Sequence, residues 1–126
     1  MLRAYAASID VALRNCLVIA IHSFQIVELS PTTGYIEGEA LLVDGSHLVF
    51  FEFLRQGEPR LEREKYRYHY MDGDNQLIFR YDNAPHHSEV ATFPHHNHTS
   101  LGADESTAPD FATVLAEVEK AFLGLP

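Results

Sequence analysis

The pattern of apolar residues changes from helical to strand-like within the first half of the chain. Leu2, Tyr5, Ile9 and Leu13 recur at helical spacing and predict a short amphipathic helix over residues 2–14. Three segments rich in Val, Ile and Phe then predict strands over residues 17–29, 35–43 and 47–55. A turn at residues 30–34 and the hairpin signal Asp44-Gly45-Ser46 separate these strands.

The next hairpin shows the clearest alternation of apolar and polar positions. Residues 65–70 and 77–82 alternate on either side of Asp72-Gly73-Asp74-Asn75. A loop centred on Gly73-Asp74 pairs the apolar side chains as Tyr70–Leu77, Tyr68–Phe79 and Tyr66–Tyr81, and this face must pack on the core. The other face then pairs His69–Ile78, Arg67–Arg80 and Lys65–Asp82. Two facing arginines repel unless an acid or an anionic ligand lies between them.

The last third of the chain is polar before it becomes helical. Pro85 and Pro94 predict a loop or short edge strands between residues 82 and 99, and residues 101–108 are polar. Pro109 suits the first turn of a helix that Gly124 closes, with one apolar stripe: Phe111, Val114, Leu115, Val118 and Phe122. We therefore expect one α+β domain over residues 1–126, with an antiparallel sheet of about five strands flanked by an N-terminal and a C-terminal helix.

Composition narrows the class of protein. The net charge of −9 argues against nonspecific attachment to nucleic acid or to an anionic membrane. The longest apolar run, residues 17–21, is too short to span a bilayer, and no signal peptide is expected. A single cysteine, Cys16, excludes an intrachain disulfide and suits a reducing compartment. We expect a cytoplasmic protein that does not enter the membrane.

The basic residues are concentrated in the centre of the chain. Six of the nine lie in one segment: Arg55, Arg60, Arg63, Lys65, Arg67 and Arg80. They form either a local cationic patch or a solvated strand face balanced by Glu58, Glu62 and Glu64. Glu37 and Glu39 share one strand face, and we interpret them as solvated strand charges.

Five of the eight histidines lie between Asp82 and Thr99: His86, His87, His95, His96 and His98. Because residues two apart on an extended segment point the same way, His96 and His98 could bind one metal ion. One histidine of the adjacent pair His86–His87, such as His86, and a carboxylate, Asp82 or Glu89, could complete a site for Zn, Ni or Mn.

Two other interpretations of this window need no metal. In the first, two of its histidines act as acid and base on a phosphodiester, while Asp82 orients one of them. The phosphate would then be held by three residues of the preceding hairpin: Arg67, His69 and Arg80. In the second, the imidazoles cap turns and pair with Asp82, and the loop only braces the fold.

Three motifs resemble the TumE-like family of small prokaryotic proteins, many of which are toxins of toxin–antitoxin pairs. They are Tyr66-Arg67-Tyr68-His69-Tyr70, the stretch 77–87, and Thr92-Phe93-Pro94-His95-His96-Asn97-His98. The likeness extends over most of the chain, although Asn97 stands where a Lys is expected, which removes one positive charge from the candidate site.

The resemblance implies a toxin that a cognate protein antitoxin holds in check. Because many small toxins of such systems cleave RNA, we predict a small ribonuclease or phosphodiesterase whose catalytic residues are His86, His87, His96, His98 and Asp82. A metal-dependent phosphoesterase is a variant of this prediction. The alternative is a non-enzymatic interaction module with a structural or metal-binding histidine loop. An exposed edge strand would also allow a homodimer.

Overall fold

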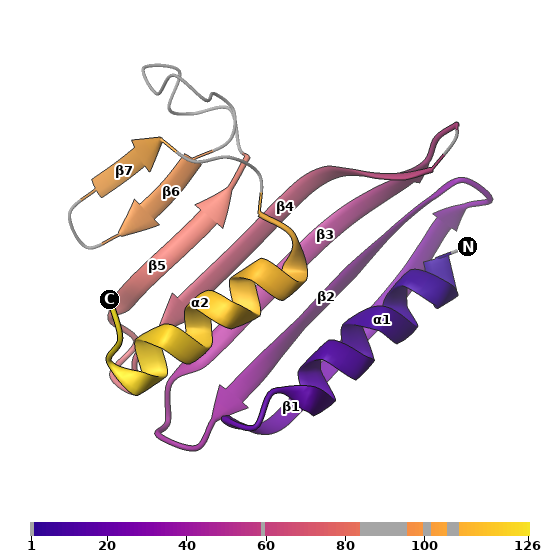
Figure 1. Cartoon of the computed structure of the whole chain (residues 1–126). Helices are drawn as coiled ribbons and strands as arrows, with labels where there is room; N and C mark the ends of the chain where they lie inside the picture. The colour runs from indigo at the N-terminus through magenta and orange to yellow at the C-terminus, as the bar shows by residue number, and fades with distance from the viewer. Residues whose placement is uncertain (1, 59, 84–95, 100–101, 106–108) are drawn as a thin grey trace.

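The computed structural model describes residues 2–58, 60–83, 96–99, 102–105 and 109–126, with the backbone alone for 96–99 and 102–105. Figure 1 shows the arrangement of its elements. In chain order these are α1 (Leu2–Asn15), β1 (Ile19–Ser30), β2 (Thr33–Leu42), β3 (His47–Gln56), β4 (Leu61–Met71), β5 (Leu77–Asp82), β6 (His96–Thr99), β7 (Gly102–Glu105) and α2 (Phe111–Leu123).

The strands form one antiparallel sheet in sequence order, from β1 at one edge to β7 at the other. This confirms the predicted α+β class, both helices and the five predicted strands. Two short strands extend the sheet: β6 lies in the stretch predicted to be a loop or short edge strands, and β7 lies in residues predicted only to be polar. None of the helices in the described ranges is long and apolar enough to cross a membrane.

Both helices lie on the same face of the sheet, which we call the helix face (Figure 1). In β3, alternate residues are buried against them: Leu48, Phe50, Glu52 and Leu54. The ring of Phe50 meets that of Phe111 edge-on, with centroids 5.0 Å apart, so α2 is anchored over the middle of β3. Each fully buried side chain of this kind contributes about 2 kcal/mol to folding.

Helix α2 begins at Phe111, two residues later than a helix with Pro109 at its first position. Asp110 is the N-cap, and its side chain accepts a hydrogen bond of 2.8 Å from the backbone N–H of Thr113. Pro109 therefore precedes the cap and lies outside the first turn. The end of the helix agrees with the prediction, because Gly124 adopts a left-handed φ of 69° there.

The register of the β4–β5 hairpin differs from the predicted one. Tyr70 pairs with Phe79, and Tyr68 pairs with Tyr81, a shift of two residues along β5. The connection spans residues 72–76, in which Asp72 Oδ1 accepts bonds of 2.9 Å from two backbone N–H groups and Asn75 has a φ of 64°. A bulge at Tyr70/Met71 completes the shift. The aromatic face was assigned correctly, but the pairings predicted across it and across the opposite face are wrong.

Candidate functional site

The sheet face opposite the helices carries two rows of polar residues, each running across five strands. We call this face the open face, because no described helix covers it (Figure 1). The histidine row contains Ser23, Glu39, Val49, His69 and Arg80, and β6 continues it by register with His98. The arginine row contains Gln25, Glu37, Phe51, Arg67 and Asp82, and continues by register with His96.

This register changes the environment of the two predicted phosphate-binding arginines. Arg67 and Arg80 do not face each other, as predicted; Arg67 lies opposite Asp82, and Arg80 lies opposite His69. Arg80 Nε and Asp82 Oδ2 form an ion pair of 2.9 Å, with the Asp82 side chain almost fully buried. The acid that must separate two close cations is therefore supplied by the protein itself.

The surroundings of His69 disfavour its charged form. Burial lowers the pKa of His69, and the positive charges of Arg80 and Arg67, together with His47, lower it further. A neutral imidazole can accept a proton at neutral pH, whereas it attracts a phosphate only weakly. The phosphate-binding role of His69 stays a prediction, and the direction of its pKa shift makes a neutral imidazole there chemically reasonable.

The predicted histidines divide into two groups. The backbone of β6 places His96 opposite Asp82 and His98 opposite Arg80, so these two histidines belong to the strand that neighbours β5. Predicted site residues His86 and His87, with His95 and Glu89, lie outside the described residues. Within the part of the chain that is described, no three His, Cys, Asp or Glu side chains are grouped to hold a metal ion. The metal site of His86, His96 and His98 stays a prediction.

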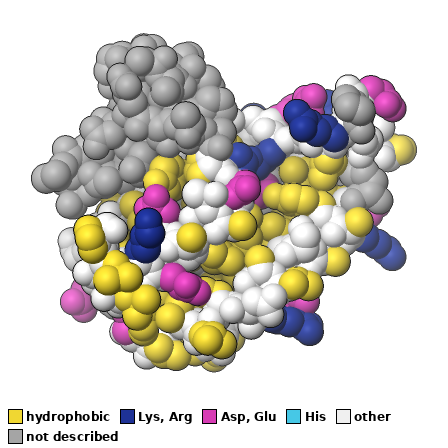
Figure 2. Space-filling model, in the orientation of Figure 1, with side chains coloured by type: hydrophobic (Ala, Val, Ile, Leu, Met, Phe, Trp, Pro, Cys, Tyr) yellow, Lys and Arg dark blue, Asp and Glu magenta, His cyan; other side chains and the backbone are white. Residues whose placement is uncertain are grey.

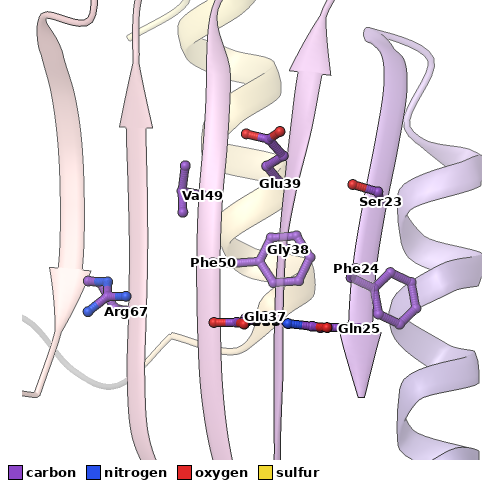
Figure 3. Close-up of a pocket in the computed structure, with 9 residues that line it drawn as sticks. All are labelled: Ser23, Phe24, Gln25, Glu37, Gly38, Glu39, Val49, Phe50 and Arg67. Carbon is purple, nitrogen blue, oxygen red and sulfur yellow. Dashed lines mark hydrogen bonds between the residues drawn. The ribbon is translucent and has the colours of Figure 1, made fainter. Parts of the chain in front are cut away.

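A groove of about 470 Å³ lies beside these rows on the open face (Figure 3). Figure 3 shows Gln25, Glu37 and Arg67 at one level across the strands, with Glu39 on the same strand as Glu37. The Gln25 side-chain amide donates a hydrogen bond of 2.5 Å to Glu37 Oε1. Glu37 and Glu39 therefore line a groove, in which Glu39 is exposed, as its interpretation as a solvated strand charge predicts, and Glu37 is half-buried. Extending the strand register through the β2–β3 and β3–β4 hairpins would have placed Glu37 in one row with Arg67 and Glu39 in one row with His69.

An aromatic strip borders the same groove. The rings of Tyr35 and Phe51 lie 5.6 Å apart, and Phe51 stands between Glu37 and Arg67 in the register. The Arg67 guanidinium lies 5.7 Å from the Phe51 ring centroid, within cation–π range. The predicted assignment of Tyr66, Tyr68 and Tyr70 to the core is correct, since all three are buried on the helix face. The half-buried aromatic rings of the open face come from other strands.

A buried carboxylate on the helix face was missed from the sequence. Glu52 is 1 % exposed and accepts hydrogen bonds from the hydroxyls of Tyr5 and Tyr68. Arg63 Nη1 donates to the Tyr68 hydroxyl at 2.6 Å, and its guanidinium lies 4.4 Å from the Tyr66 ring centroid. Burial and then the charge of Glu52 raise the pKa of Tyr68. The sequence signal for this buried carboxylate was the position of Glu52 among the inward-facing residues of β3.

This cluster fastens α1 to the sheet, because Tyr5 belongs to the helix and Glu52 to β3. Arg63 and Asp110 line a neighbouring groove at the start of α2, where Figure 2 shows acidic and basic side chains side by side among apolar ones. Two tyrosine donors and one nearby arginine compensate the buried charge. We assign the cluster a structural role.

Fold and site together define a small α+β protein whose sheet carries helices on one face and titratable polar rows on the other. The family model described as Toxin TumE matches residues 9–122, and the chain belongs to this toxin family. The match includes every strand, the second half of α1 and all but the last residue of α2, and it confirms the predicted resemblance. A toxin of this family implies a cognate antitoxin. No match was found among curated proteins or among solved structures.

Proposed function

We propose that this toxin cleaves RNA by acid–base catalysis on the open face of its sheet. The observation that carries the proposal is His69, whose pKa is lowered by burial and by two arginines that could hold a phosphate beside it. A neutral base next to two cations is the combination that phosphodiester cleavage by the neighbouring 2′-hydroxyl requires.

Two arginines, one aspartate and two histidines each have a part in the proposed reaction. Arg67 and Arg80 bind the oxygens of the phosphate, and Asp82 keeps Arg80 in place through its ion pair. His69 takes the proton of the 2′-hydroxyl, whose oxygen forms a bond to phosphorus. The bond from phosphorus to the 5′ oxygen breaks, and that oxygen receives a proton from a second histidine. The products are a 2′,3′-cyclic phosphate and a free 5′-hydroxyl.

The second histidine would come from the histidine-rich window. His96 and His98 are favoured, because register places them next to Asp82 and Arg80, while His86 and His87 stay candidates from the sequence. The net charge of −9 suits an enzyme that meets its RNA in a restricted setting better than one that binds RNA generally.

The test compares His69→Gln with a matched control, His22→Gln. His22 belongs to β1 and pairs with Ala40, which lies outside both polar rows. Its Nε2 atom lies 3.4 Å from Asp10 Oδ1 on α1, so the side chain is directed towards the helix face. Purified His69→Gln should cleave RNA at least about a hundredfold more slowly than the wild type, whereas the control should stay near the wild-type rate. Growth arrest on expression should follow the same order, and the product of the adjacent gene should relieve it.

Two further measurements separate the alternatives. Dialysis against a chelator should leave the activity unchanged; loss of activity with restoration by Zn, Ni or Mn would favour the metal-dependent enzyme instead. Alanine at His86 or His96 should relieve toxicity in folded protein. Full toxicity of folded His69→Gln would overturn the site, and toxicity without any cleaved RNA would favour a non-enzymatic interaction module.

A further inference from the structure

The groove on the open face lies directly beside the proposed catalytic residues. Glu39 and His69 share the histidine row, with Val49 on the strand between them. Since neighbouring strands are about 4.8 Å apart, their backbones are separated by roughly 10 Å. That separation is comparable with the distance from the edge of a nucleobase to the phosphate of its own nucleotide. A base in the groove would therefore belong to the nucleotide whose phosphate is cleaved.

The groove offers a nucleobase both a surface and a hydrogen-bonding partner. Val49 and the bordering Phe51 ring provide apolar surface on which a base can lie. Glu39 is exposed and forms no hydrogen bond or ion pair with another described residue, so both of its oxygens can accept bonds. Glu37, in contrast, already accepts a bond from Gln25.

The chemistry of a carboxylate selects among the four bases. A carboxylate has two adjacent acceptors and no donor. Guanine presents two adjacent donors, N1–H and the N2 amino group, and can bind it with two parallel hydrogen bonds. The other bases place an acceptor next to their donor, which the carboxylate repels. A negative group close to the RNA is tolerable here, because Arg67 lines the same groove.

We infer that the groove binds a guanine of single-stranded RNA and that Glu39 is the residue that selects it. This inference rests on the proposed ribonuclease function and names the nucleotide at which that enzyme acts. Glu39 is a specificity-determining residue and takes no part in proton transfer. Cleavage is then expected on the 3′ side of guanosine, where the phosphate meets His69, Arg67 and Arg80.

The test measures binding separately from cleavage. The probes are short fluorescent oligouridines with one central 2′-deoxynucleotide, which is guanosine, adenosine, cytidine or uridine and cannot be cleaved because it lacks the 2′-hydroxyl. By fluorescence anisotropy, the wild type should bind the guanosine probe about tenfold or more tightly than the other three. Glu39→Gln should abolish this preference.

Glu28→Gln is the matched control, because it removes the same charge from a strand position that register places away from both polar rows. It should keep the preference for guanosine, which excludes a general effect of charge on RNA binding. Equal binding of all four probes, or a preference that survives in Glu39→Gln, would overturn the inference. RNA cleavage without base preference would leave the proposed function standing, whereas a toxin that neither binds nor cleaves RNA would refute both.

Discussion

Replacing Tyr68 by phenylalanine removes one oxygen from the core and keeps the ring. Tyr68 is fully buried, and its hydroxyl donates to Glu52 while it accepts from Arg63. In the variant, the buried carboxylate of Glu52 keeps, among the residues that the structure describes, only the bond from Tyr5. Arg63 is only half-buried, so water can replace the acceptor that it loses.

The size of the effect follows from the charge of the partner. A hydrogen bond to a charged group contributes about 1.5–3 kcal/mol, and a buried charge that loses a donor pays the upper part of that range. We therefore expect Tyr68→Phe to lower the free energy of unfolding by about 3 kcal/mol. The midpoint of thermal unfolding should fall by roughly 10 °C for a chain of this size.

Tyr70→Phe is a control from the same strand. Tyr70 is equally buried, but its hydroxyl bonds to the neutral hydroxyl of Ser46 at 2.7 Å, so its loss should cost about 1 kcal/mol. Urea unfolding of the wild type and both variants, followed by circular dichroism, measures the difference. If Tyr68→Phe costs no more than Tyr70→Phe, Glu52 is not a charged acceptor in the folded protein, and the reasoning fails.

Three further predictions concern the packing at Gly38, the N-cap of α2 and the reactivity of the Cys16 thiol. A Cβ on Gly38 would lie 2.4 Å from Phe24 Cβ and from a backbone oxygen, so Gly38→Ala should lower the urea midpoint by an amount equivalent to about 1–3 kcal/mol. Asp110→Ala should cost about 1 kcal/mol near pH 7. Hydrogen bonds from Thr113 lower the pKa of Asp110, so this stabilisation exists above the ordinary carboxyl pKa of about 3.9 and should shrink as the pH falls below it. Burial and the bond to a glutamate raise the pKa of Cys16 to about 11, so a thiol reagent should modify it slowly in folded protein and rapidly in urea; equal rates would contradict this.

Local patterns in the sequence were sufficient to predict both helices and the five longer strands of the fold. The spacing of Leu2, Ile9 and Leu13 predicts α1, and all three are buried against the sheet. Gly124 predicts the end of α2 and adopts the left-handed conformation that glycine favours. Such signals depend on neighbours along the chain, so they can be recognised without knowing which distant residues come into contact.

The pairing between strands was harder to predict because loop geometry decides it. The residues of the β4–β5 connection allow several loop lengths, and alternation alone does not choose among registers that differ by two. Asp72 binds two backbone N–H groups and so selects the observed loop. The difference matters for function, since it places Asp82 rather than Arg80 opposite Arg67.

For the buried residue Glu52, the position could be predicted from the sequence but its hydrogen-bonding partners could not. Glu52 continues the inward alternation of β3, so the sequence shows where it lies but not what compensates it. Its partner Tyr5 is 47 residues away and Tyr68 is 16 residues away. Only the three-dimensional arrangement of α1, β3 and β4 brings these groups together, and no local pattern records it.

The two rows of the open face exist because each strand of the sheet pairs with its neighbour in sequence. Arg80 and Asp82 are two residues apart on β5, and so are their register partners His98 and His96 on β6. Alternate residues of a strand share a face, so Arg80 pairs with His98 and Asp82 pairs with His96 on the same face of the sheet. A slip of one residue between β5 and β6 would break both pairings at once. The spacing of the histidines therefore has meaning only together with that of the arginine and the aspartate. A substitution that shifts the β5–β6 register should harm the proposed site as much as loss of either histidine.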